Sequence, residues 1–336
     1  MAQGDARPAR DGNGEDVMWY FSFGAMCNPV AMRRRGVISD VGFPAKIQGY
    51  RLTFDLPGGF ANITKDDAPD AECHGVLHAM TKGNFDHLAY VERAYTHRAV
   101  LAHPYGPGLV QGDTMEATVP AAPGSPSSAL LPPGAEARGV EARVFWYDAP
   151  REVPPLPSER YVRVIALGLE KHGVDPDWIA RVRRSEHRPA RTPDKYWTFE
   201  SCPCVRKVPE AEMRAFTVEE VRAFGQGPKA ARQSVCAIGR TVVRAETTDA
   251  EYREMLNTYY CGAYIDYVLC CNIYEPALPP VRRISDMTPA HTAFALDFVL
   301  DDMMLHDGTV TIIGTLSEEW TEDKMSTEEG APKDSE

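Results

Sequence analysis

Short hydrophobic stretches, bounded by glycine, proline and polar clusters, dominate the first half of the chain. Five of them have the length and the aromatic or β-branched content that are typical of strands. They are Trp19–Phe23, Ala45–Phe54, Gly75–Met80, residues 99–105 and Val140–Tyr147. The pattern predicts a β-rich first domain.

Helical signals lie between and after these strands. A short helix is predicted around residues 29–35. Ser158 is a suitable N-cap for a helix that runs to about His172, and Gly173 is a suitable C-terminal stop. An Asp-Pro pair at residues 175–176 predicts the start of a further helix, because proline fits the first helical position.

One predicted helix, Asn84–Tyr95, carries a carboxylate where an apolar residue is expected. Glu92 lies in the middle of an apolar stripe at helical pitch, whose members are Phe85, Leu88, Ala89 and Tyr95. Burial would raise the pKa of the Glu92 carboxyl group, as a general acid and base requires near neutral pH. The alternative is a rotated or frayed helix with Glu92 in solvent.

Length and composition narrow the class of protein. The 336 residues suggest two domains, since one domain usually takes about 100–200 residues. A hydrophobic content of 43% and a charged content of 25% are typical of a folded soluble protein. No apolar run approaches the ~20 residues that cross a bilayer, and the first residues lack the apolar core of a secretory signal. We therefore expect a cytoplasmic protein with reduced cysteines and no membrane contact.

The net charge of −12 is concentrated at one end. Residues 317–336 hold eight acidic residues and two lysines, and this segment therefore carries half of the net charge. The remainder is only mildly acidic and argues against a nucleic-acid partner. Five arginines form one basic patch, for which a solvated helix end is the simpler interpretation. They are Arg181, Arg183, Arg184, Arg188 and Arg191.

Composition also predicts the domain organisation. The expected segments are a disordered leader, a first domain, a polar linker, an α+β accessory domain and an acidic disordered tail. Their bounds are 1–16, 17–185, 186–200, 201–320 and 321–336. Residues 112–139 are rich in proline and alanine, and strand character resumes directly after them. We therefore expect an insertion within the first domain.

The second domain mixes both kinds of element. Helices are predicted at Val218–Phe224 and Asp249–Tyr259, and strands at Val235–Val243, Tyr267–Tyr274 and Val310–Leu316. Parts of this region, residues 216–221 and 236–243, resemble the opening of cytochrome b5-like domains. The haem-ligand motif H-P-G-G is missing, so we expect no haem and a module that contacts a protein partner.

A series of short motifs follows one order along the first domain. Tyr20–Pro29 resembles Y-F-x-Y-G-S-N-M-N-P. The others are Arg34-Arg35-Gly36, Gly49–Phe54 (G-Y-R-L-x-F), Gly59–Ile63 (G-F-A-N-I), His74–His78 (H-G-V-L-H), Leu88–Glu92 (L-D-x-x-E) and Pro-Ser-x-x-Tyr at residues 157–161. Through these motifs, residues 17–182 resemble the γ-glutamylcyclotransferase family, including its plant AIG2-like branch.

This resemblance implies a fold and a reaction. The fold is α+β, a small mixed β-barrel with flanking helices, here followed by a smaller α+β domain. The reaction is the cyclisation of a γ-glutamyl amine or peptide to 5-oxoproline with release of the amine, as in glutathione metabolism, without a cofactor. Glu92 matches the family's catalytic glutamate, and Tyr161 matches its site tyrosine.

The residue types fit this chemistry. Ring closure is intramolecular, so holding the substrate folded back supplies much of the catalysis. The turn after the first strand would offer backbone N–H groups to the substrate carboxylate or to the developing oxyanion. Arg34 or Arg35 would add positive charge, although a solvated helix face is the simpler interpretation. Candidate substrate-binding residues are Phe23, Gly24, Ala25, Met26, Cys27, Asn28, Tyr95 and Tyr161.

The turn departs from the family pattern. Ala25-Met26 replaces Ser-Asn, and Phe23 replaces tyrosine, so side-chain donors are missing. One lost donor at such a site often costs about two or three decades in rate. We favour an enzyme with a different substrate or weak activity. The alternatives are an inactive small-molecule-binding or regulatory protein on the same fold, and the cleavage of another γ-glutamyl amide in a biosynthetic pathway.

Two cysteine pairs and two histidines are further candidates for metal or redox sites. Cys202 and Cys204 are too close for ordinary zinc spacing and lack a partner pair, so no metal is expected. Cys270-Cys271 lies in an apolar run and indicates core packing. His74 and His78 lie on a predicted strand and would not share a helical face.

Overall fold

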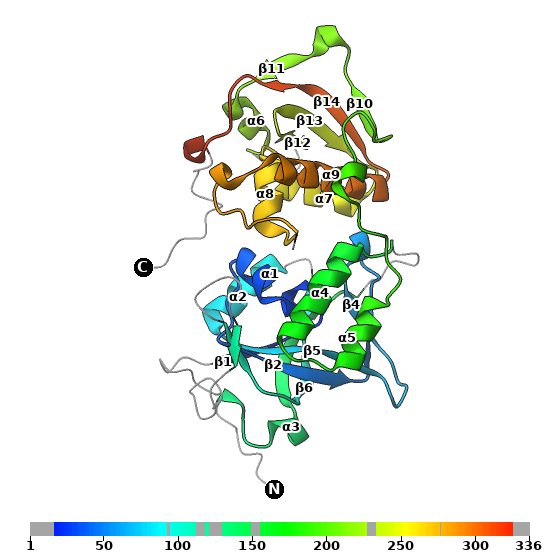
Figure 1. The fold of residues 1–336 in the computed structure, drawn as a ribbon, viewed down its shortest axis with the longest axis vertical. Coiled ribbons are helices and arrows are strands. Elements are labelled where there is room, and N and C mark those ends of the chain that lie inside the picture. Colours follow the sequence, from blue (N-terminus) through cyan, green and yellow to red (C-terminus); the bar gives the residue numbers. More distant parts are fainter. Residues whose placement is uncertain are drawn as a thin grey trace. The chain divides into compact units, whose positions relative to one another are not determined.

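The computed structural model describes residues 17–92, 95–111, 118–120, 130–148, 155–226, 233–275 and 277–324. The chain divides into two compact units, Met1–Ala190 and Arg191–Glu336 (Figure 1). The predicted leader, most of the predicted insertion and most of the acidic tail lie outside the described residues.

The first unit is built on a closed β-barrel. Five strands follow one another around it in the order β5, β1, β9, β6 and β2, and β2 pairs back with β5. They are β1 (Val17–Ser22), β2 (Val41–Gln48), β5 (Glu72–Thr81), β6 (Thr96–Pro104) and β9 (Val140–Trp146). The β1–β9 pair is parallel and the other pairs are antiparallel. The prediction of a small mixed barrel is therefore confirmed.

Smaller strands extend or flank the barrel. β7 (Leu109–Gln111) pairs with β2 and with β8 (Thr118–Pro120), while β3 (Tyr50–Thr53) and β4 (Asn62–Lys65) form a separate hairpin. The prediction of one strand over Ala45–Phe54 was wrong. Gly49 divides it, because its φ of +75° turns the chain where other residues would be strained.

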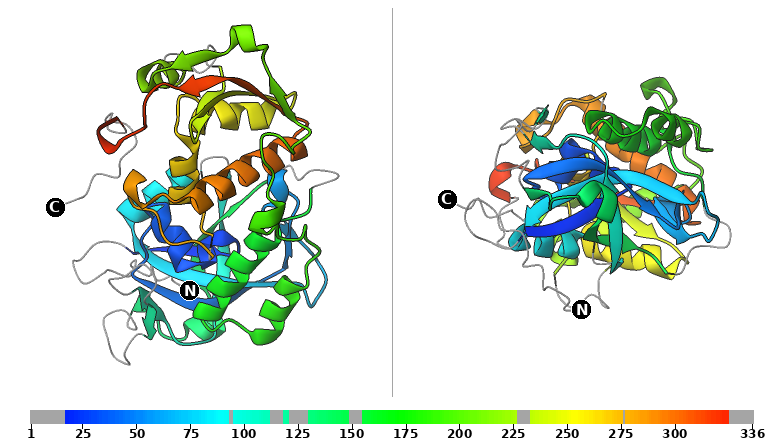
Figure 2. Two further views of the ribbon diagram at one scale, coloured as in Figure 1. Left: turned by 45° about the horizontal axis from the view of Figure 1, so that its top comes forward. Right: turned by 90° about the horizontal axis from the view of Figure 1, so that it is seen from below.

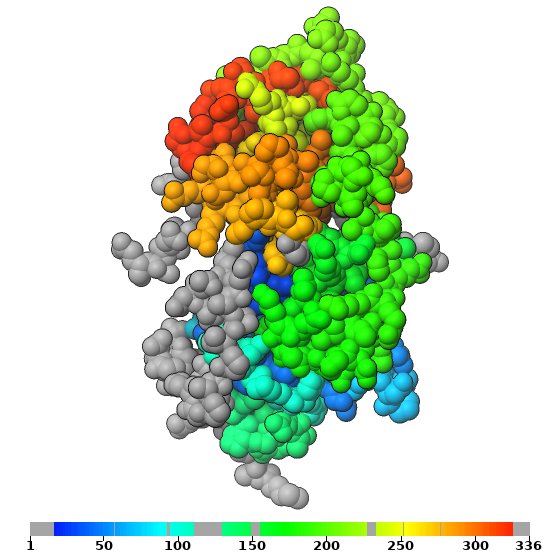
Figure 3. All heavy atoms as spheres, in the orientation of Figure 1, coloured from blue at the N-terminus to red at the C-terminus, as the bar shows by residue number. Residues whose placement is uncertain are grey.

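Helices of the first unit lie outside the barrel (Figure 2). They are α1 (Pro29–Arg34), α2 (Lys82–Val91), α3 (Ala135–Arg138), α4 (Glu159–Lys171) and α5 (Pro176–Arg183). The predicted caps are confirmed, since Ser158 accepts a hydrogen bond from the Tyr161 N–H and Asp175 from the Trp178 N–H. Helix α3 lies within the predicted insertion and was not predicted. In Figure 3, α4 and α5 (green) form a continuous face of this unit.

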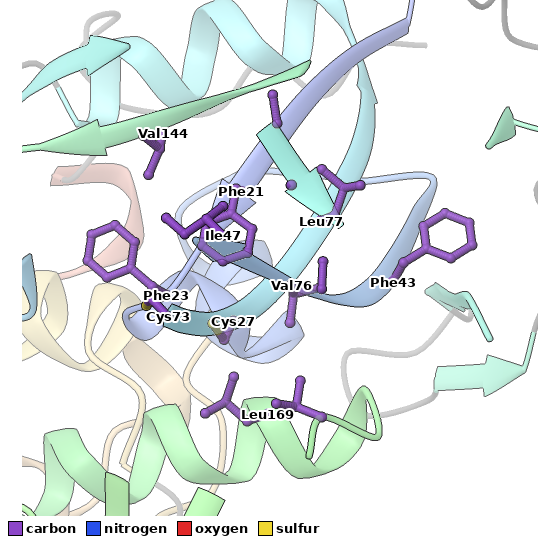
Figure 4. Close-up of a cluster of buried hydrophobic side chains, with 14 of the residues drawn as sticks. Phe21, Phe23, Cys27, Phe43, Ile47, Cys73, Val76, Leu77, Val144 and Leu169 are labelled. Atoms are coloured by element: carbon purple, nitrogen blue, oxygen red, sulfur yellow. The ribbon is translucent and has the colours of Figure 1, made fainter. Parts of the chain in front are cut away.

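Alternation along β1 separates two hydrophobic clusters. Trp19 and Phe21 belong to the barrel core with Leu77 and Ile47, several of which are drawn in Figure 4. Tyr20 points the other way, into a second cluster formed with residues of α1 and α2. This period of two is the reason that one strand supports both the core and the region outside it.

The second unit is an α+β domain around a five-stranded sheet. Its strands are β10 (Val205–Lys207), β11 (Arg214–Phe216), β12 (Val235–Ile238), β13 (Thr241–Glu246) and β14 (Thr309–Leu316). The strands lie in the sheet in the order β10, β14, β13 and β12, and β11 also pairs with β14. Its helices are α6 (Val218–Phe224), α7 (Ala250–Tyr259), α8 (Ile265–Asn272) and α9 (Pro289–Leu305).

Two predictions for this unit need correction. Tyr267–Tyr274 is not a strand, because residues 265–272 form helix α8, which buries Ile265, Leu269 and Cys270. Short apolar runs with aromatic residues fit either state, and packing decides between them. Val235–Val243 is a hairpin, turned at Gly239, whose φ is +56°. Helix α9 was not predicted.

Short 3-10 helices connect these elements. They are η1 (Ala25–Cys27), η2 (Pro57–Gly59), η4 (Pro193–Lys195), η5 (Glu210–Glu212), η7 (Ile284–Asp286) and η8 (Glu322–Lys324). Helix η1 is the turn that follows β1 and leads into α1.

The segment predicted as a polar linker, residues 186–200, is shared between the units. The Ala190 N–H donates to the Glu159 carboxylate of α4 at 2.6 Å, within the first unit. From Arg191 onward the chain is held by α9, because Arg191 pairs with Asp297 at 3.1 Å and the Trp197 N–H donates to the same carboxylate at 2.6 Å. Much of this segment is therefore held by side-chain contacts.

Asp266 gives the second unit a pH dependence. The carboxylate is fully buried at the start of α8 and accepts the Gly239 N–H at 3.0 and 3.1 Å. Burial raises the pKa of Asp266 to about 6 from 3.8, against the hydrogen bonds of Thr292 and Gly239. The folded state therefore binds a proton more tightly than the unfolded state, and stability falls as the pH rises from about 4 to 6.

We expect Asp266→Asn to remove this dependence. The unfolding free energy of the wild type minus that of the variant should fall by about 2 kcal/mol between pH 4 and pH 7, because most of the energy of a shift of about two units falls in this range. Urea denaturation at several pH values measures it. Asp286→Asn, at an exposed carboxylate whose pKa is lowered, is the control and should show no such fall. A difference that stays constant with pH for Asp266→Asn would contradict the assignment.

Candidate active site

Glu92 lies directly after α2, as its C-cap, and its N–H donates to the Leu88 carbonyl at 2.8 Å. The helix was predicted over Asn84–Tyr95, but it begins earlier, after its N-cap Thr81, and it ends earlier, at Val91. The carboxylate nevertheless turns toward the buried side of the helix, and only 14% of the side chain is exposed. Of the two alternatives for Glu92, the buried one holds.

Arg35 is the charged partner of Glu92. Its Nη1 lies 3.4 Å from Oε1 of Glu92. Burial raises the pKa of the Glu92 carboxyl group, and the positive charge of Arg35 lowers it by a smaller amount. The resulting pKa is above the usual range of a glutamate, which suits proton transfer near neutral pH.

The end of α1 places Arg35 at this position. The helix begins at the Asn28 cap, and Arg35 follows its last turn. The Arg35 carbonyl accepts a hydrogen bond from Nε2 of His87 on α2 at 2.8 Å. Gly36 then leaves the helix with a φ of +69°, where a Cβ would lie 3.0 Å from the same His87 nitrogen. The Arg-Arg-Gly motif therefore ties α1 to the helix that carries Glu92.

Three tyrosines lie within electrostatic reach of this ion pair. Burial raises the pKa of Tyr20, Tyr95 and Tyr161, to about 12 for Tyr161, and the negative charge of Glu92 adds to the shift at each of them. Tyr95 and Tyr161 were predicted as site residues, whereas Tyr20 was not. The signal for Tyr20 was the alternation of β1, which turns it away from the barrel core and toward α2.

Tyr161 contacts the turn that follows β1. Its hydroxyl oxygen accepts the Ala61 N–H at 3.2 Å and also the Ala25 N–H. A Cβ on Gly24 would lie 3.2 Å from the same oxygen, so glycine permits this close approach. Two amides occupy the acceptor positions of the hydroxyl, and its own proton remains for donation.

The rest of the predicted turn is divided between the site and the core. Met26 is buried beside Arg35, with Sδ 3.9 Å from Nη1. Phe23 and Cys27 pack in the barrel core (Figure 4), and burial raises the pKa of the Cys27 thiol to about 12. Asn28 caps α1 and donates to the Val164 carbonyl at 3.1 Å. These last three side chains are engaged in packing and hydrogen bonds away from Glu92.

The backbone donors of the turn are also partly used. The Cys27 N–H donates to the Gly24 carbonyl at 3.0 Å, and the Asn28 N–H donates to the Ala25 carbonyl at 2.9 Å. Together with the Ala25 N–H on Tyr161, three amides of the predicted anion site therefore have partners within the chain.

Buried polar groups of β1 and β5 form hydrogen bonds next to the turn. His78 contacts the Ser22 hydroxyl at 3.0 Å and the Ser39 hydroxyl at 3.2 Å. Burial lowers the pKa of His78 well below its usual value, so the ring is neutral. His74, also on β5, bonds instead to Glu72 and Tyr105. The two histidines of the H-G-V-L-H motif therefore have separate structural partners.

The candidate metal ligands of the second unit bond within it. Among the described residues, no three His, Cys, Asp or Glu side chains are placed to hold a metal ion. Cys202 and Cys204 lie with their sulfurs 3.2 Å apart in the core. His291 bonds to Thr288 and Pro279, and His306 bonds to Asp249 at 2.9 Å.

Tyr161→Phe tests the contact between α4 and the site. The substitution leaves the Ala61 N–H without its acceptor, and an unsatisfied buried amide costs about 1–3 kcal/mol. We expect a loss of stability of that size and faster hydrogen exchange at Ala61. Tyr105→Phe is the matched control, since it removes a hydroxyl that also accepts a backbone N–H, that of Asp175, elsewhere on the barrel. Unchanged exchange at Ala61 in Tyr161→Phe would contradict the contact.

Comparison with solved structures gives several similarities, each to about half of the chain. A γ-glutamyl cyclotransferase is 17% identical over 52% of this chain and 90% of its own, with a TM-score of 0.38. An uncharacterized human protein is 17% identical over 51% of this chain and 89% of its own, with a TM-score of 0.37. YkqA from Bacillus subtilis is 16% identical over 52% of this chain and 57% of its own, with a TM-score of 0.36. No protein-family model and no curated protein matches the chain.

Among the described residues, no helix is long and apolar enough to cross a bilayer.

Proposed function

We propose that the first unit is a γ-glutamylcyclotransferase-type enzyme that converts a γ-glutamyl amine or peptide into 5-oxoproline and the free amine. One observation carries the proposal. A largely buried carboxylate, Glu92, pairs with the guanidinium of Arg35, which also contacts the turn that carries the family's first motif, and its charge raises the pKa of three tyrosines. Perturbed carboxyl groups in such surroundings are candidates for proton transfer.

The reaction needs one group that first accepts and then donates a proton. Glu92 takes a proton from the α-ammonium of the substrate. The freed nitrogen attacks the γ-carbonyl carbon, and a nitrogen–carbon bond closes the five-membered ring. Protonated Glu92 then gives its proton to the leaving nitrogen as the original amide bond breaks. Glu92 passes the second proton of the ring nitrogen to the released amine in the same way, so the products are a neutral lactam and an ammonium. No water is consumed, and Glu92 returns to the carboxylate.

Tyr161 is the proposed donor to the developing oxyanion. Its oxygen is fixed by the Ala61 and Ala25 amides, so its proton has a defined direction. A preorganised donor stabilises charge that develops in the transition state without reorganisation. This role would replace part of what the turn lacks through Ala25 and Met26.

A binding protein on the same fold is the second candidate. It is favoured by the missing donor side chains of Ala25 and Met26 and by the amides of Cys27 and Asn28, which are used within the turn. The region around Glu92 and Arg35 would then hold a small amino acid or carboxylate without turnover.

A substrate panel separates the two. The full-length protein is incubated with γ-glutamyl amino acids, γ-glutamyl amines and glutathione, and 5-oxoproline is followed by mass spectrometry against heat-denatured protein. Enzyme-dependent 5-oxoproline from at least one substrate is expected. Silence across the panel, with stabilisation of the fold by one of the compounds, would favour the binding protein instead.

A further inference from the structure

We propose that Arg35 binds the α-carboxylate of the substrate, so that Arg35 and Glu92 together select a zwitterionic α-amino-acid head group. The inference deepens the proposed function and rests on it for the identity of the γ-glutamyl chain. It assigns a specificity-determining role to a residue that the sequence alone placed on a solvated helix face.

Toward the described residues, the guanidinium of Arg35 uses only one of its nitrogens. Within that part of the chain its side-chain contacts run through Nη1, at 3.4 Å to Glu92 and 3.9 Å to the weak acceptor Sδ of Met26. A guanidinium carries five N–H donors in a planar fork, which fits a carboxylate through two parallel hydrogen bonds. Since 28% of the side chain is exposed, the remaining donors can be reached by a ligand.

The competing donors of the turn are mostly engaged. The amides of Ala25, Cys27 and Asn28 have acceptors within the chain. The side chains of Ala25 and Met26 offer no N–H or O–H group. A substrate carboxylate next to Glu92 therefore needs another cationic or polar donor, and Arg35 is in contact with both Glu92 and the turn.

The opposite charges of Arg35 and Glu92 complement the whole α-amino-acid head group. An α-amino acid carries an ammonium and a carboxylate on one carbon atom. The pair of Arg35 and Glu92 presents the opposite charges across 3.4 Å. The ligand can replace this long single contact with two charge pairs, the carboxylate on Arg35 and the ammonium on Glu92, and the buried region stays neutral.

This placement also serves the chemistry. With the carboxylate held by Arg35, the α-nitrogen lies next to the carboxylate that must take its proton. The γ-carbonyl then folds back toward Tyr161, whose pKa is affected by both Arg35 and Glu92. Positioning of this kind contributes directly to an intramolecular reaction.

The test compares two substrates that differ only at the α-carbon. One is the best γ-glutamyl substrate of the panel, and the other is its α-carboxamide analogue, which keeps the α-ammonium and loses the negative charge. The wild type should prefer the carboxylate by about 10- to 100-fold in kcat/KM, the usual range for a hydrogen bond to a charged group. In Arg35→Gln this preference should fall toward unity, chiefly through a higher KM for the carboxylate.

Two further variants keep the result interpretable. Arg35→Lys retains the positive charge and should keep most of the preference, so a structural role alone would not reproduce the pattern. Arg181→Gln removes a guanidinium that lies over Trp178 on α5, outside the site, and should behave as the wild type. A preference that survives unchanged in Arg35→Gln would overturn the inference.

Failure of the proposed function would be recognised separately. If the wild type forms no 5-oxoproline, binding of L-glutamine and of its α-carboxamide is measured by calorimetry in the same variants. Tighter binding of the carboxylate that depends on Arg35 would support the inference for a binding protein. Equal binding of both ligands, or no binding of either, would overturn it.

Discussion

Glu92→Gln is expected to lower kcat/KM for 5-oxoproline formation by about 10²–10⁴-fold, the usual contribution of a general acid and base. Glutamine is nearly isosteric, so Arg35 keeps a polar neighbour and the fold should be retained. The variant cannot accept the proton of the α-ammonium, and steady-state kinetics with the best substrate of the panel measures the loss.

The pH profile gives an independent check on the same residue. Burial keeps the pKa of Glu92 above the ordinary glutamate range. As the pH decreases, the wild-type rate should therefore begin to fall at a higher pH than it would with an exposed glutamate.

Asp86→Asn is the matched control for the substitution. It changes an exposed carboxylate of α2 that pairs with Lys82, and it should leave the rate within about twofold. A Glu92→Gln variant with wild-type kcat/KM would exclude Glu92 from proton transfer.

Gly168→Ala is expected to destabilise the first unit by about 1–3 kcal/mol and to reduce activity with it. A Cβ at this position of α4 would lie 2.5 Å from the Asn28 nitrogen and 2.6 Å from the Cys27 carbonyl carbon. Both are backbone atoms of the turn, which cannot move aside without shifting Gly24 and Ala25. The helix that carries Tyr161 would then separate from the turn that Tyr161 contacts.

The control is a second helical glycine. In α2, a Cβ on Gly83 would meet only the Thr81 hydroxyl at 3.9 Å, which is ordinary contact. Gly83→Ala should therefore stabilise the protein by about 0.4–1 kcal/mol through the unfolded chain. Chemical denaturation of both variants measures the two effects. A stabilising Gly168→Ala would contradict the close packing of α4 on the turn.

Local signals in the sequence were sufficient for much of the first unit. Capping residues at Ser158 and Asp175 fixed the starts of α4 and α5, because side-chain oxygens there satisfy the first N–H groups. The stripe of α2 also indicated the buried side of Glu92. These features depend on a few neighbouring residues, and the chain around them does not alter them.

Other features depended on residues far apart in the sequence. Arg35 resembled a solvated helix end until His87 and Glu92 of α2 were placed against it. The apolar run of α8 carries no periodicity that separates helix from strand, and its burial decides the state. The use of turn amides by Tyr161 likewise follows from the packing of α4, 100 residues away from Ala61.

The isotopic origin of the oxygen in the product shows whether the ring closes by intramolecular attack. The protein is incubated with its best γ-glutamyl substrate in water enriched in ¹⁸O, and the masses of the products are determined by mass spectrometry. Intramolecular attack consumes no water, so the account predicts 5-oxoproline without ¹⁸O, formed in equal amount to the free amine and absent with Glu92→Gln. Glutamate that carries one ¹⁸O would indicate hydrolysis and would contradict the account.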